Sequence, residues 1–255
     1  MAEFGWYNFL LIVARIASFF VTLPITSARG VPNVIKVFLA LVVSYLIFLS
    51  RDFSKLAVDS SSSLRLFLLV GGEVFTGLVL GFVVLLFFAV FRMAGELADI
   101  KIGLSMAGIF DPQFGSSVTL LSQFYYLLAI IVYFALNGHH HLFLAISHSF
   151  ALVPLGESVF SDVTVKLLFE SFYYIWVMAF QIAAPVVAAI LITDISLGLI
   201  SKTVPQLEVF MIGLPLKFFL GLFVIYLTLP YFSLLMEDIF SRLYVDLINI
   251  MESMV

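Results

Sequence analysis

The sequence predicts an all-α, polytopic membrane protein with about six long helices arranged in hairpins. Of its 255 residues, 63% are hydrophobic and only 11% are charged, whereas an ordinary soluble domain is about 45–50% apolar and about 25% charged. Its 12 basic and 16 acidic residues are too few to coat a water-soluble monomer of this size. Several uncharged stretches also approach the length of about 20 residues that a bilayer-spanning helix needs.

Four stretches without charged residues or histidine are the main predicted spans: 74–91, 112–138, 171–193 and 218–236. Two more apolar runs complete the six, 4–24, which carries Arg15, and the shorter 34–50. Because the chain opens on Glu3 rather than on basic residues, we expect its first run to remain as a helix rather than to be removed as a signal. The short connection between the last two spans predicts an antiparallel hairpin.

Composition also argues against several classes of function. The chain has no cysteine, which excludes disulfides and thiol chemistry, and its net charge of −4 gives no basis for binding nucleic acid. His139, His140 and His141 are adjacent, so their side chains diverge on a helix, and no zinc-protease spacing is present. We expect no enzyme activity, metal or cofactor.

Charged residues within or beside the predicted spans each need an explanation, because a charge at mid-bilayer costs about 2.5–3.5 kcal/mol on insertion scales. Arg92, Glu96 and Asp99 would share one face if the third helix continued past residue 91. That face would either emerge into water as a solvated ion pair, or line a cavity or a joint between subunits. The complete set is Arg15, Glu73, Arg92, Glu96, Asp99, Lys101, Asp194 and Lys217.

Glycine and proline interrupt the spans. Gly77 and Gly81 have the spacing that lets two membrane helices pack backbone to backbone. Pro185 lies inside the fifth span, Pro215 opens the sixth, and Pro205 with Gln206 lies in the turn between them. These residues suit the broken helices of a transporter, curved helices wound against neighbours, or the ordinary use of glycine and proline in membrane helices.

The segment 106–115 combines two glycines, a proline and two phenylalanines. Irregular backbone at membrane depth occurs only where protein buries it or water fills a cavity. The segment therefore lies outside the bilayer, or it lines or blocks a pore. Its residues are Met106, Ala107, Gly108, Ile109, Phe110, Asp111, Pro112, Gln113, Phe114 and Gly115.

Taken in order, these segments resemble the R-type (FliR) family of type III export-gate subunits, flagellar and virulence-associated. The ordered set covers roughly residues 10–220. Its elements are Arg15, Pro24, Gly72-Glu73, Gly77, Gly81, Ala94-Gly95-Glu96, Asp111–Gly115, Asn137-Gly138-His139-His140, Ala184-Pro185, Asp194, Pro205-Gln206 and Gly213–Lys217.

The resemblance implies a two-part chain: residues 1–160, including the 106–115 loop, would be similar to the P-type subunit, and residues 161–255 to the Q-type hairpin. It further implies one copy of the chain in a helical assembly with several P-type and Q-type subunits and with the B-type switch subunit. The assembly would lie in the bacterial inner membrane within the flagellar basal body, touch membrane lipid and pass unfolded secreted proteins. The 106–115 loop would plug its channel.

The alternative is a small proton-coupled secondary transporter in which Glu73, Glu96 or Asp194 carries the proton. Such a transporter should show two repeated halves with matching broken helices. The sequence shows no convincing repeat, and the gate subunit is the favoured interpretation.

Overall fold

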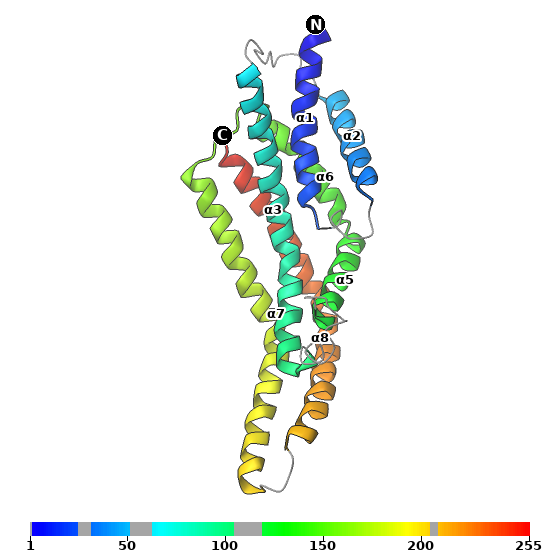
Figure 1. Cartoon of the computed structure of the whole chain (residues 1–255), viewed down its shortest axis with the longest axis vertical. Coiled ribbons are helices and arrows are strands. Elements are labelled where there is room, and N and C mark those ends of the chain that lie inside the picture. Colours follow the sequence, from blue (N-terminus) through cyan, green and yellow to red (C-terminus); the bar gives the residue numbers. More distant parts are fainter. Residues whose placement is uncertain (1, 25–31, 52–62, 105–118, 205–208) are drawn as a thin grey trace. The chain divides into compact units, whose positions relative to one another are not determined.

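The chain is all-α, as the sequence predicts. The computed structural model describes residues 2–24, 32–51, 63–104, 119–204 and 209–255, and this part of the chain forms seven helices and no strand (Figure 1). The helices are α1 (Ala2–Thr22), α2 (Asn33–Ser50), α3 (Ser63–Ile102), α5 (Leu120–Ala135), α6 (Gly138–Leu152), α7 (Asp162–Thr203) and α8 (Val209–Glu252).

Three of the helices are much longer than the spans predicted inside them. Helices α3, α7 and α8 contain 40, 42 and 44 residues. Four described helices, α2, α3, α7 and α8, are long and apolar enough to cross a membrane, and α5 with α6 would make a fifth broken span. The expectation that Pro215 opens the last helix is wrong. That helix begins at Val209, because the apolar residues before Pro215 continue the helix and membrane helices tolerate proline.

The predicted fourth span, 112–138, contains a shorter helix. Helix α5 begins at Leu120, and residues 112–118 lie outside the described part of the chain. A bend of 74° separates α5 from α6. Asn137 lies at the bend with φ of +56°, in the left-handed region that asparagine adopts more readily than most residues. The Asn-Gly pair therefore ends the helix where the sequence analysis placed its end.

The chain divides into two compact units that interleave in sequence. The first comprises residues 1–87, 137–172 and 240–255, and the second comprises residues 88–136 and 173–239. Helices α3, α7 and α8 each contribute residues to both units. We expect residues 1–160 to be similar to the P-type fold and residues 161–255 to the Q-type fold. The two compact units are defined by contacts within this chain and do not test that similarity, so it stays a prediction.

In the first unit, α3 packs against α1 through glycine. A Cβ atom on Gly77 would stand 2.1 Å from the backbone oxygen of Arg15, and one on Gly81 would stand 1.7 Å from Thr22 Oγ1. The two backbones therefore meet with no room for a side chain between them. On another side of α1, the rings of Phe9 and Phe48 join it to α2 at 5.7 Å between centroids.

The second unit is built around aromatic side chains and a helical hairpin. The Phe88 and Tyr133 rings meet edge to face at 5.2 Å, and Phe232 lies 5.5 Å from Phe91. In the hairpin, Gly213 of α8 approaches Leu197 of α7. Asp194 pairs with Lys217 further from the turn. These two contacts show that α7 and α8 run antiparallel here, as the short connection predicts.

The α1–α3 crossing yields a prediction. Gly77→Ala should lower the thermal unfolding midpoint in detergent, because a methyl group forced between two backbones costs about 1–3 kcal/mol. Gly71→Ala, on the same helix with nothing within 4 Å of its added Cβ, is the matched control. It should leave the midpoint unchanged or raise it, since alanine favours helix over glycine by about 0.5–1 kcal/mol. Equal effects of the two substitutions would contradict the close crossing.

Candidate functional site

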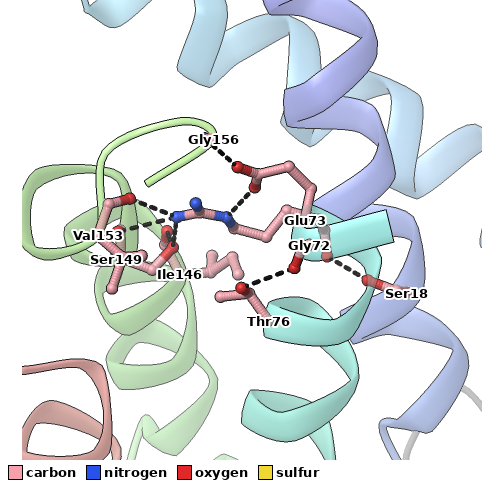
Figure 2. Close-up of polar contacts among 9 residues, drawn as sticks. Ser18, Gly72, Glu73, Thr76, Ile146, Ser149, Val153 and Gly156 are labelled. Atoms are coloured by element: carbon pink, nitrogen blue, oxygen red, sulfur yellow. Dashed lines mark hydrogen bonds and ion pairs between the residues drawn. The ribbon is translucent and has the colours of Figure 1, made fainter. Parts of the chain in front are cut away.

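A buried polar network joins α1, α3 and the end of α6, all in the first unit. Arg15 and Glu73 are both completely buried, and Arg15 Nε donates to Glu73 Oε2 at 2.5 Å. Glu73 Oε1 accepts a second hydrogen bond from the backbone N–H of Gly156 at 2.8 Å. Figure 2 shows the dashed contact between Glu73 and Gly156, above the turn of α3 that carries Thr76.

Arg15 also caps the carboxyl end of α6. Its Nη1 donates to the backbone oxygens of Ser149 and Val153, both at 2.9 Å, and its guanidinium lies 4.5 Å from the centre of the Phe150 ring. A cation at a helix carboxyl end is stabilised by the last carbonyl groups and the helix dipole. The one guanidinium therefore compensates both the Glu73 carboxylate and the end of α6.

The geometry of the Arg15–Glu73 network is that of a structural contact between helices rather than a reactive site. Both carboxylate oxygens of Glu73 are occupied, and an ion pair with no exposure is not open to a substrate in this structure. Of the three guanidinium nitrogens of Arg15, Nε and Nη1 donate hydrogen bonds, and Nη2 has no hydrogen-bond partner among the described residues. The network links three segments that are more than fifty residues apart in sequence.

The predicted charged face after residue 91 splits into different environments in the second unit. Helix α3 does continue through these residues, but Arg92 and Glu96 are exposed whereas Asp99 is completely buried. The Arg92 guanidinium stacks 3.9 Å from the centre of the Tyr126 ring of α5. Asp99 Oδ2 accepts the backbone N–H of Leu121 at 2.9 Å. Each of these two residues thus joins α3 to α5.

The remaining predicted charges lie at the surface. Lys101 is exposed in the last turn of α3, a position that complements the helix dipole. Lys217 and Asp194 form an ion pair with 22% and 43% of their side chains exposed. Because their neighbours on both helices are mostly exposed apolar side chains, this pair places a neutralised charge on an otherwise apolar face.

Several predicted residues fall outside the described residues. These are the whole segment 106–115, together with Pro205 and Gln206. Pro185 is described and lies inside α7, whose helix runs through it.

Of the buried charged residues in the described part of the chain, one is not identified by the sequence analysis. Asp246 of α8, only 6% exposed, accepts hydrogen bonds from Arg242 Nε at 2.9 Å and from Ser171 Oγ of α7 at 3.1 Å. The i, i+4 spacing of Arg242 and Asp246 is the signal that could have found it. The sequence also does not reveal the hydrogen bonds that Arg15 donates to Ser149 and Val153. Their acceptors are backbone oxygens, which every residue has.

The amino-acid sequence was compared with known protein families and with characterised proteins. Residues 6–243 match the family model described as bacterial export proteins, family 1. The chain is 33% identical to the flagellar biosynthetic protein FliR of Bacillus subtilis, over 91% of this chain and 90% of that protein. It belongs to the FliR family of bacterial export proteins. Two further FliR proteins, from Escherichia coli and Aquifex aeolicus, are 27% and 28% identical over 94% and 91% of this chain and 91% and 89% of their own lengths.

The described part of this FliR-family chain holds no group of three or more histidine and acidic side chains that could bind a metal. Arg15 and Asp99 instead bond to backbone atoms at helix ends.

The Arg15–Glu73 pair yields a double-mutant prediction. Arg15→Leu and Glu73→Leu should each lower stability strongly, because breaking a buried ion pair by removing one partner costs about 3–5 kcal/mol. The double variant should cost much less than the sum, since no uncompensated charge remains. It should stay below the parent, because the carbonyl oxygens of Ser149 and Val153 lose their donor.

The measurement is a thermal or denaturant unfolding series in detergent on all four proteins. Lys166→Ala supplies a control, because Lys166 and Glu170 form a pair 4.0 Å apart whose side chains are 77% and 56% exposed. This substitution should leave the unfolding midpoint unchanged. Additive costs of the Arg15 and Glu73 substitutions would show that the pair is not a coupled unit.

Proposed function

We propose that this chain is a single-copy subunit of the flagellar type III protein export gate and forms part of the channel for unfolded substrate proteins. Family membership supports a role in bacterial export, and the relatives named above are flagellar biosynthetic proteins. The lengths and apolar surfaces of α7 and α8 carry the argument for an assembly with other subunits.

Helices α7 and α8 are too long for lipid alone to cover them. At about 1.5 Å per residue, helices of 42 and 44 residues extend over about 60 Å of helix axis, roughly twice the thickness of the hydrocarbon core. Large apolar side chains are exposed along both helices. Examples on α7 are Val163, Phe169, Tyr173, Phe180, Ile192 and Leu199, and examples on α8 are Met211, Phe219, Tyr226, Tyr231, Leu234 and Val245.

Apolar surface that lipid does not reach must be covered by protein to stay out of water. Monomeric soluble proteins rarely expose contiguous apolar patches above a few hundred Å². The partners that fit are the P-type and Q-type gate subunits, whose own apolar helices would pack along α7 and α8. The B-type switch subunit and membrane lipid would cover further surface. The assembly would lie in the bacterial inner membrane, within the flagellar basal body.

The 106–115 segment, which lies outside the described residues, is the proposed channel plug. Its glycines allow the backbone to bend at low cost, and Ile109, Phe110 and Phe114 are large enough to fill a lumen and exclude water and ions. The plug would close the channel at rest and move aside when an unfolded protein passes.

Native mass spectrometry tests the assembly. The tagged chain is purified in detergent with and without co-expressed P-type and Q-type subunits from the same genome. We expect one copy of this chain with several copies of both partners, because only unlike helices would complete its apolar faces. A monomer or homodimer in the presence of well-expressed partners would refute the proposal and favour carboxylate-dependent transport assays.

Deletion of 106–115 tests the plug. We expect assembled gates that carry the deletion to leak small ions, measured as ion flux in gate-containing vesicles, because the segment that fills the channel at rest is gone. Deletion of residues 53–62, a more polar segment of equal length, is the control and should not raise the flux. Unchanged permeability in gates that assemble without the 106–115 segment would eliminate the plug role.

A further inference from the structure

Asp99 connects the end of α3 to the beginning of α5, within the second unit. Its carboxylate is completely buried, and Oδ2 accepts the backbone N–H of Leu121, the second residue of α5, at 2.9 Å. The first N–H groups of a helix have no partner within the helix and need an acceptor. The side chain of Thr119, at the usual capping position, makes no such hydrogen bond. The cap of α5 therefore comes from another helix.

The charge of Asp99 suits this position. In the described part of the chain no cation pairs with its carboxylate, and Oδ1 has no hydrogen-bond partner. A buried carboxylate without a cation is costly unless another positive potential compensates it. The amino end of a helix carries such a potential, equivalent to about half a unit charge. The start of α5 is the described group that supplies it.

The backbones of α3 and α5 also touch one turn before Asp99. A Cβ on Gly95 would lie 2.5–2.6 Å from backbone atoms of Leu121 and Ser122. The end of α3 is fixed as well. The N–H of Gly103, with φ of +92°, donates to the backbone oxygen of Asp99, and the Ile102 side chain fills the space over Gly221 of α8. The carboxylate thus acts where the two helices are already in close contact.

We propose that Asp99 is a positioning residue that fastens the first turn of α5 to the last turns of α3, so that the ends of these two helices hold a fixed separation. Where this inference concerns the channel, it rests on the proposed function, because the segment joining the two helices includes the proposed plug. Its structural part concerns described residues only and can be measured independently.

Spin labels measure the separation directly. The chain has no cysteine, so Ile100→Cys and Leu120→Cys, at positions 55% and 73% exposed, would carry the only labels. The parent double-cysteine chain should give strong, uniform dipolar broadening of the EPR spectrum. Asp99→Ala should reduce the close-range population several-fold, because the tie is lost. Asp99→Asn should retain most of it, because the amide oxygen still accepts the Leu121 N–H.

A rescue variant separates fastening from simple capping. In Asp99→Ala combined with Thr119→Asp, the new aspartate can cap α5 from its own capping position, yet it cannot connect α5 to α3. We expect this variant to stay as loosely spaced as Asp99→Ala. The proposal is overturned by an unchanged spectrum in Asp99→Ala, by equal loosening in Asp99→Asn, or by full restoration in the rescue variant.

A second experiment measures ion flux through gates assembled with P-type and Q-type partners. Native mass spectrometry verifies that the gates have assembled. Asp99→Ala, with or without Thr119→Asp, should raise ion flux several-fold, and Asp99→Asn should stay near the parent value. Failure of the parent chain to assemble would refute the proposed function and leave the spin-label result standing. Normal flux in assembled Asp99→Ala gates whose labels have separated would instead refute the channel role of Asp99.

Discussion

The rest of the structure depends on one constraint, the amount of apolar helix surface that must be kept from water. Three helices of 40 residues or more exceed the thickness of a bilayer core. In an apolar stretch of 18 residues, 67% of the α3 residues are buried within the chain, whereas only 33% and 17% are buried in the corresponding stretches of α7 and α8. The chain thus covers most of this part of α3 itself and leaves most of the apolar windows of α7 and α8 uncovered. The proposed gate assembly would meet this need.

Buried polar groups decide which helices pack together. In apolar surroundings the hydrophobic effect does not distinguish one apolar helix face from another, so specificity falls to close glycine contacts and to polar groups that have few possible partners. Arg15 holds α1, α3 and α6 in one arrangement, and Asp99 holds α5 on α3. Both residues bond to backbone atoms at helix ends, where unpaired groups are most costly. Breaking such a buried contact is costly, because it leaves one polar group buried without a partner.

The sequence predicts the fold class and most of the helices because apolar runs without charge have one stable form in lipid. It identifies Arg15 and Glu73 as charges that need partners, and Gly77 with Gly81 as a packing motif. It does not show that Arg15 pairs with Glu73, because the two lie 58 residues apart. Nor does it show that Asp99 is buried while Glu96, three residues earlier, is exposed. Helical spacing places both on one face and says nothing of what packs there.

Helix ends are the feature that the sequence predicts least well, because they too depend on what surrounds the helix. The predicted spans end just before the nearest charged residue. The third span therefore covers only 74–91, between Glu73 and Arg92, yet α3 runs from Ser63 to Ile102. Charged residues end a span in lipid, but they continue a helix wherever protein or water surrounds them. The polar continuation of α3 carries Arg92 and Asp99, so the part of the helix that the apolar pattern misses supplies these two polar contacts with α5.

Photo-crosslinking along the exposed apolar side of α7 and α8 tests the central claim most directly. A photoreactive amino acid would replace one exposed apolar residue at a time, from Val163 to Leu199 and from Met211 to Val245, in cells that make the complete export apparatus. The account predicts adducts with unlike protein subunits over a large part of both helices, with lipid adducts confined to a band about 20 residues long. Lipid adducts along the whole of both helices, with no protein adducts, would contradict it.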